Sequence, residues 1–134
     1  MKGFQLRPPR LPRLSENDIE RQCLDALRHR RYRPERLHAG TFRSLDGARV
    51  ITGHAKGTPD YVVTHELYPA FYLEVKRPGE SPTPEQKLKH VELRLNDLAV
   101  VWVDGYEALL AWLDKHQQKA QRLWREYVQS NPAS

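Results

Sequence analysis

The sequence has one cysteine and no long apolar run, and each absence excludes a class of protein. Cys23 cannot form a disulfide within the chain, which fits a reducing compartment. No apolar run approaches the roughly 20 residues that a membrane-spanning helix needs. The N-terminal segment carries basic residues without an apolar core, so we expect no secretory signal. The six histidines include no pair at the spacing of zinc ligands. We therefore expect a cytoplasmic protein with no membrane partner.

Basic residues are concentrated in the first quarter of the chain. The chain of 134 residues has the usual size of one domain, and its net charge is +5. Residues 1–36 hold 10 basic and 5 acidic side chains, whereas residues 37–134 hold 12 of each. A concentrated positive charge attracts polyanions by releasing their counterions, so a nucleic acid is one candidate partner. The alternative is a solvated basic face without a partner.

The pattern of prolines, caps and apolar residues predicts helices at both ends of the chain. Three prolines in residues 1–14 predict an extended basic arm. Ser15 is a good N-cap for a helix at about 16–30, which Pro34 stops. A second helix is predicted at about 84–97, with Pro84 at its first position and Leu88, Val91, Leu95 and Leu98 on one face. A last helix starts near residue 106, either unbroken or divided near residue 116, before a loose tail at 130–134.

Short β-branched and aromatic runs predict the strands between these helices. Asp46-Gly47 favours a hairpin that joins residues 37–45 to residues 48–54. Further strands are predicted at 61–64, 71–76 and 99–103. The order of helices and strands predicts an α/β fold with a mixed central sheet flanked by helices.

Three charged residues on two neighbouring predicted strands carry the chemistry. Asp60 opens one strand and Glu74 lies near the end of the next, so the two carboxylates can lie side by side. Such a pair is costly unless a cation neutralises it, and carboxylate oxygens suit Mg²⁺ or Mn²⁺. Lys76 shares a strand face with Glu74, because side chains alternate along a strand. Val75 points away from the site, but its carbonyl is a candidate third protein ligand.

This combination of residues resembles the PD-(D/E)xK signature of the restriction-endonuclease-like nucleases. Within that superfamily, the sequence closely resembles the VRR-NUC family, the virus-type replication-repair nucleases, over residues 15–113. The matching segments are residues 15–22 (SENDIERQ), 57–60 (GTPD), 73–79 (LEVKRPG), 81–86 (SPTPEQ) and the strand at 100–103. Each short motif is weak alone; their order and spacing carry the resemblance.

The resemblance implies a role for each matching residue. Asp60 and Glu74 resemble the metal ligands, and Lys76 resembles the catalytic lysine. Glu16 resembles an acidic residue of the first helix that contacts the metal, directly or through water. Gln86 resembles a glutamine at the start of the following helix that supports the site or a phosphate.

Each of these residues also has an ordinary structural interpretation that involves no catalysis. Glu16 also suits the positive end of a helix, and Glu20, one turn later, is its rival for the acidic role. Asp60 is also a common residue in a turn before a strand. Glu74 and Lys76 could be surface charges, and Gln86 could be an ordinary residue at a helix start.

The resemblance implies a Mg²⁺- or Mn²⁺-dependent DNA endonuclease with a restriction-endonuclease-like core at residues 15–113. Branched DNA such as a Holliday junction is the expected substrate, and symmetric cutting of a junction requires a homodimer. Residues 114–134 form a helical extension and tail. The expected setting is the nucleoid of a bacterial or phage-infected cell. Three alternatives stay open: cleavage of flaps or duplexes by a monomer, a non-catalytic nucleic-acid-binding module, and a nuclease that a partner activates.

Overall fold

Three helices and six strands make up the part of the chain that this computed structural model describes, residues 14–37, 41–43, 50–52 and 56–132. The helices are α1 (Glu16–His29), α2 (Pro84–Leu95) and α3 (Tyr106–Ser130). The strands are β1 (Arg33–Arg36), β2 (Thr41–Arg43), β3 (Val50–Thr52), β4 (Tyr61–Thr64), β5 (Phe71–Val75) and β6 (Ala99–Val103). Among the described helices, none combines the length and apolar character needed to cross a membrane.

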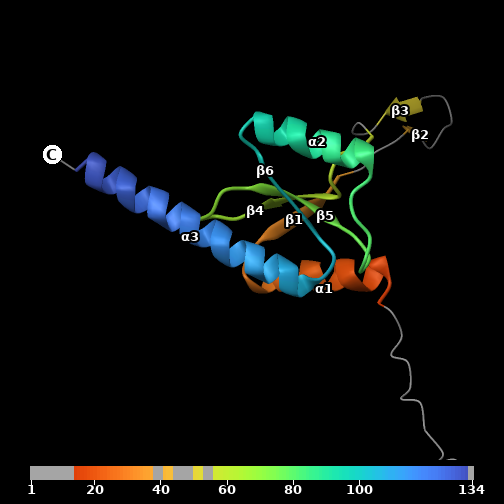
Figure 1. Ribbon diagram of the computed structural model, residues 1–134, viewed down its shortest axis with the longest axis horizontal. Helices are drawn as coiled ribbons and strands as arrows, with labels where there is room; N and C mark the ends of the chain where they lie inside the picture. The colour runs from red at the N-terminus through yellow and green to blue at the C-terminus, as the bar shows by residue number, and fades with distance from the viewer. Residues whose placement is uncertain (1–13, 38–40, 44–49, 53–55, 133–134) are drawn as a thin grey trace, which may run out of the picture.

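A four-stranded mixed sheet forms the middle layer, with α2 on one face and α1 and α3 on the other (Figure 1). The strand order is β1-β4-β5-β6. The pairs β1–β4 and β4–β5 are antiparallel, and β5–β6 is parallel. The predicted α/β class with a mixed central sheet flanked by helices is therefore confirmed. The predicted hairpin is seen as the antiparallel pair β2–β3, a separate small sheet, while its Asp46-Gly47 turn lies outside the described residues.

The pleat of β5 separates the apolar core from the charged residues. Phe71, Leu73 and Val75 are buried in one cluster with residues of α1 and α3, including Leu27 and Leu109. The intervening residues of β5 therefore point to the other face of the sheet, which α2 covers. This alternation places Glu74 between the sheet and α2.

The first strand of the sheet was not predicted. Pro34 was interpreted only as the end of a helix, but it lies within β1, which pairs with β4. The segment is polar and mostly exposed, so it lacks the apolar alternation that marks a strand. Because β1 is at the edge of the sheet, proline is tolerated there.

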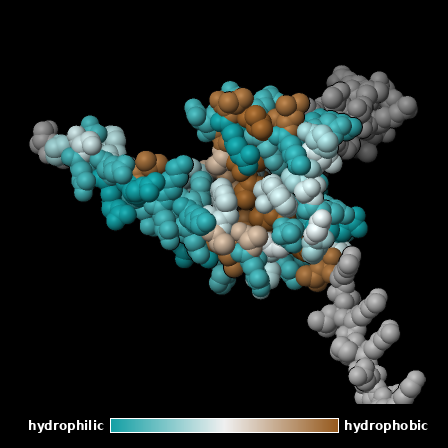
Figure 2. Space-filling model, viewed as in Figure 1, coloured by the Kyte–Doolittle hydropathy of each residue, from teal (hydrophilic) through white to brown (hydrophobic). Residues whose placement is uncertain are grey.

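Helix α2 has its apolar stripe on the outside. The predicted stripe exists, but Leu88 and Leu95 are 71% and 79% exposed, and Val91 and Leu98 are 50% and 43% exposed. Hydrophobic atoms are accordingly visible over α2 in Figure 2. The buried residue of this helix is His90. The fold thus leaves an apolar surface on α2 without a partner among the described residues.

Helix α3 is unbroken through residue 116. No glycine or proline interrupts residues 106–130, so nothing in the sequence forces a kink. Leu109 and Leu113 are buried against the sheet, whereas every residue from 121 to 132 is exposed. The second half of α3 therefore projects beyond the sheet, as Figure 1 shows.

Candidate active site

Asp60 and Glu74 lie against each other at the junction of β4 and β5. The backbone N–H of Asp60 donates to Oε2 of Glu74 at 3.2 Å. In return, Oδ2 of Asp60 accepts from the backbone N–H of Val75 at 2.9 Å. The register explains this proximity, because Tyr61, the residue after Asp60, is paired with Leu73, the residue before Glu74. The strands therefore bring together two carboxylates that are fourteen residues apart in the sequence.

Glu74 occupies an environment that disfavours a bare carboxylate. Its side chain is 0% exposed, and its Oε1 has no hydrogen-bond partner among the described residues. Burial, followed by the neighbouring Asp60, raises the pKa of Glu74 to about 8, and the nearby Lys76 acts in the opposite direction. A buried oxygen without a partner is costly, so this site favours either a proton or a cation on Glu74.

Lys76 supplies a positive charge beside this pair. It follows β5, where its backbone N–H donates to the carbonyl of Val103 at 2.8 Å. Its side chain is half-buried, and its charge lowers the pKa of both Glu74 and His90. Within the described part of the chain, no ion pair engages Lys76. The described structure therefore places its positive charge next to the carboxylate pair without a fixed ion-pair partner.

His90 is a residue of this neighbourhood that the sequence analysis missed. It is 3% exposed on the inner side of α2, and in the part of the chain that the structure describes its Nε2 has no hydrogen-bond partner. Burial, Arg94 and Lys76 together lower the pKa of His90, so the imidazole is neutral near pH 7. The spacing of four residues between Gln86 and His90 could have indicated that both lie on the same side of α2.

The turn before Asp60 depends on glycine. Gly57 has a φ of +88°, and a Cβ added there would lie 2.8 Å from the backbone oxygen of Glu85. The turn therefore packs directly on the start of α2, and the buried Pro59 lies between Gly57 and Asp60. This close approach fixes where Asp60 enters β4.

Replacing Gly57 with alanine is expected to destabilise the protein by about 2–3 kcal/mol, because left-handed strain adds to a clash with backbone. Gly79→Ala is the matched control: Gly79 has a φ of +84°, but an added Cβ would meet no atom within 4 Å. Its expected cost is about 1 kcal/mol. Denaturant unfolding measures both, and equal losses would contradict the proposed contact with α2.

Glu16 and Gln86 each lie in the first turn of a helix. Glu16 is exposed in the first turn of α1, where Ser15 and Asp18 form the capping box. Gln86 is half-buried, and its Oε1 accepts from the backbone N–H of Thr83 at 2.8 Å, forming the capping box of α2. Among the described residues, no three carboxylate, histidine or cysteine side chains are grouped as metal ligands. The metal role of Glu16 and the supporting role of Gln86 stay predictions.

Glu20 is engaged in a separate polar network. It accepts hydrogen bonds from the hydroxyl of Tyr61 and from the guanidinium of Arg36. Arg36 also donates to the Tyr61 hydroxyl at 2.8 Å, which closes the network between α1, β1 and β4. Burial, together with the adjacent Glu20, raises the pKa of Tyr61. Glu20 thus connects α1 to β4, the strand that Asp60 directly precedes.

The donor set formed by Asp60 and Glu74 fits a hard divalent cation. Both side chains offer oxygen atoms, and a cation would supply the partner that Oε1 of Glu74 lacks among the described residues. The backbone N–H of Val75 holds Asp60 in place, and the Val75 side chain is buried in the core. The Val75 carbonyl stays a predicted third ligand.

Searches of the sequence against protein-family models and against curated proteins find no match. The likeness to the VRR-NUC family therefore rests on the motif residues and their spacing.

Proposed function

We propose that this protein is a Mg²⁺- or Mn²⁺-dependent DNA endonuclease of the restriction-endonuclease-like type. The observation that carries the proposal is the Asp60–Glu74 pair, in which Glu74 is buried. Among the described residues, one of its carboxylate oxygens has no hydrogen-bond partner, and the lysine beside it has no ion pair. The arrangement of helices and strands also supports it, because a mixed sheet between helices places the motif residues at neighbouring strand ends.

The chain's own residues divide the work of hydrolysis between them. Asp60 and Glu74 hold the cation, with the Val75 carbonyl and Glu16 as the further ligands that the family resemblance implies. A bound Mg²⁺ supplies Lewis acidity that lowers the pKa of water and offsets charge on phosphate. Lys76 orients the attacking water or the scissile phosphate through its ammonium group. Gln86 supports the start of α2 beside the site.

A branched DNA substrate and a homodimer are further parts of this proposal. Symmetric cutting of a four-way junction needs two active sites related by a two-fold axis. The exposed apolar stripe of α2 offers a self-complementary surface, since Leu88, Val91 and Leu95 lie on one face of a regular helix. Exposed apolar patches of this kind mark protein interfaces. The same helix carries His90 on its inner side, so this contact would bring two sites close together.

Leu88→Glu with Leu95→Glu is expected to convert the protein from dimer to monomer, because charged side chains would replace the centre of the apolar contact. Light scattering measures the mass directly. Leu123→Glu with Trp124→Glu, on the exposed part of α3, makes the same chemical change elsewhere and is expected to leave the dimer intact. A wild-type protein that is monomeric at all concentrations would contradict the dimer.

Cleavage of labelled four-way junction, flap and linear duplex DNA tests the proposed function. The wild type is expected to cut with Mg²⁺ or Mn²⁺ and to stop when EDTA is added. Asp60→Asn is expected to reduce the rate by about 100-fold or more, because it removes a charged metal ligand. Equal rates for both proteins would indicate a contaminant and contradict the mechanism. Tight binding to DNA without cleavage would favour the alternative, a non-catalytic or partner-activated module.

A further inference from the structure

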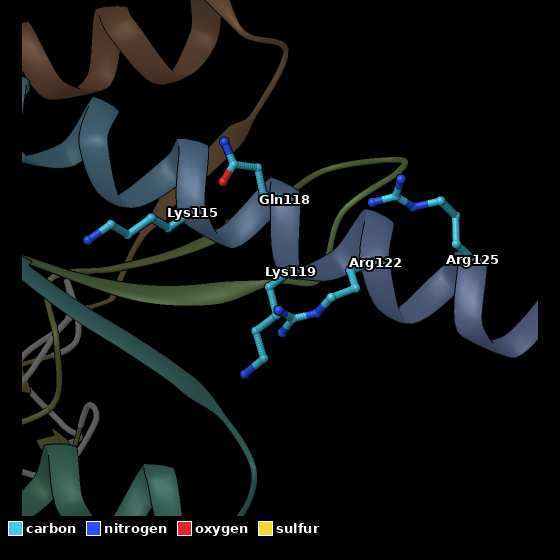
Figure 3. A pocket seen from close by; sticks show the side chains of 5 residues that line it. All are labelled: Lys115, Gln118, Lys119, Arg122 and Arg125. Carbon is cyan, nitrogen blue, oxygen red and sulfur yellow. The ribbon is translucent and has the colours of Figure 1, made fainter.

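Four basic residues form a stripe along the second half of α3. Lys115, Lys119, Arg122 and Arg125 are spaced by four, three and three residues, the spacing that keeps side chains on one side of a helix. These residues and Gln118 line an open hollow of about 480 Å³. Figure 3 shows their side chains along this part of α3. All four basic residues are exposed. We call these four residues the α3 stripe.

The positive charge of the α3 stripe is not neutralised by neighbouring acids. Eight ion pairs are observed in the described part of the chain, and none involves a residue of the stripe. Asp114, just before the stripe, is paired with Arg30 at 2.9 Å. Glu126 is the one acidic residue in the sequence from 115 to 130, which leaves three net positive charges on this segment, histidine neutral. Such a row of cations suits a polyanion.

The α3 stripe begins at the end of the sheet opposite to the candidate active site. Helix α3 starts just after Val103, which pairs with Val75 beside Glu74. At His116 it has reached the other end of β5, where Nε2 of His116 lies 2.9 Å from the carbonyl of Pro69. With a rise of 1.5 Å per residue, the stripe lies about 14–29 Å along the helix from the active-site end.

We propose that the α3 stripe binds the phosphate backbone of a duplex arm that extends away from the active site. The inference rests on the proposed function insofar as the polyanion is DNA. Phosphates follow one another every 3.4 Å of axis along each strand, so four cations spread over about 15 Å face several phosphates. These contacts position the DNA without reading its sequence. DNA binding would explain why α3 extends beyond the sheet, since its second half contributes no buried residue to the core.

The apolar side of this helix favours DNA over a lipid surface. Trp124 and Tyr127 continue the side of α3 that packs on the sheet, and the groove beside Trp124 is lined by Leu67 and Tyr68. The α3 stripe lies on the opposite side of the helix. In amphipathic helices that lie on membranes, the apolar face inserts and the basic face stays at the headgroups. In α3 the apolar side faces the segment of Leu67 and Tyr68, and Gln121 donates to the Tyr68 hydroxyl at 3.2 Å, so this side is directed toward the protein rather than toward a lipid surface.

Equilibrium binding of a 30-base-pair duplex tests the inference, measured by fluorescence anisotropy in Ca²⁺ over a range of salt concentrations. The test variant changes all four stripe residues to glutamine. The matched control changes Arg21, Arg28, Arg33 and Arg77 to glutamine, which removes the same charge from residues that are in ion pairs. Asp60→Asn is measured in parallel, because binding in Ca²⁺ does not depend on cleavage. Circular dichroism checks that all variants are folded.

The stripe variant is expected to lower the slope of log K against log salt by about 3–4 and to weaken binding at least 100-fold at about 0.1 M salt. The control is expected to lower the slope by less than half as much. Equal losses in the two variants would show a bulk-charge effect and overturn the proposal. Unchanged DNA binding together with lost binding to phosphatidylglycerol vesicles would overturn it in favour of a membrane. If the wild type never cleaves DNA but the stripe variant still loses DNA binding, the proposed nuclease activity is wrong and the proposed DNA binding by the α3 stripe stands.

Discussion

Glu74→Gln is expected to make the metal-free protein more stable and catalytically inactive. Burial and the neighbouring Asp60 raise the pKa of Glu74 from its ordinary value of 4.5 to about 8 in the folded protein. The folded state therefore holds a proton that the unfolded state has lost, and wild-type stability falls as the pH rises from about 4.5 to about 8. Glutamine has no charge to bury, so the variant keeps its free energy of unfolding at high pH. The wild type is expected to lose on the order of a few kcal/mol of that free energy above pH 8.

Thermal unfolding at several pH values measures this effect. At pH 9 without metal, the melting temperature of Glu74→Gln is expected to exceed that of the wild type by roughly 5–10 °C, and at pH 4.5 the two should nearly coincide. Glu92→Gln makes the same change at an exposed position of α2 and should not show this pH-dependent gain. A variant less stable than the wild type at pH 9 would contradict the burial of an unfavourable charge. Added Mg²⁺ should then stabilise the wild type and not Glu74→Gln.

Lys76→Met is expected to slow DNA cleavage by about 100- to 1,000-fold, the usual effect of losing one group that stabilises charge in the transition state. Because Lys76 forms no ion pair with the described residues and repels a bound cation, its loss should leave metal binding intact or slightly tighter. DNA affinity in Ca²⁺ should change only a few-fold. The expected result is therefore a fall in the rate of the chemical step.

Single-turnover cleavage at saturating enzyme isolates that step. Lys87→Met is the matched control, because Lys87 lies on the exposed side of α2, outside the candidate site. It should cleave at the wild-type rate. A Lys76→Met protein that cleaves within about 3-fold of the wild type would exclude Lys76 from the reaction, whatever the metal does.

The proximity of Asp60 and Glu74 was predictable from the sequence because strand geometry is regular. Asp60 directly precedes β4 and Glu74 lies in β5, two strands joined by a short turn, and the period of two predicts that Glu74 and Lys76 share one face. The helix start at Ser15 and the helix at Pro84 were also predictable, because each has a local cap that does not depend on the rest of the fold. Where local chemistry decides an element, the sequence is sufficient.

The parts that were missed depend on tertiary context. Strand β1 is polar and contains Pro34, so only its pairing with β4 identifies it. Periodicity located the apolar stripe of α2 but could not show that the helix turns His90, rather than Leu88, toward the sheet. Likewise, sequence spacing could not show that Glu20 bonds to Tyr61 and Arg36. Each of these outcomes was decided by residues distant in the sequence.

Titration of Mn²⁺ into the metal-free protein, followed by electron paramagnetic resonance of the free ion, tests the central claim most directly. The claim is that Asp60 and Glu74 hold a divalent cation. We expect the wild type and Glu92→Gln to bind Mn²⁺ with the same affinity, seen as a loss of the free-ion signal. Lys76→Met is expected to bind it equally well or slightly more tightly. Asp60→Asn and Glu74→Gln are expected to bind it much more weakly. Wild-type affinity in both of these variants, or no binding by the wild type, would contradict the account.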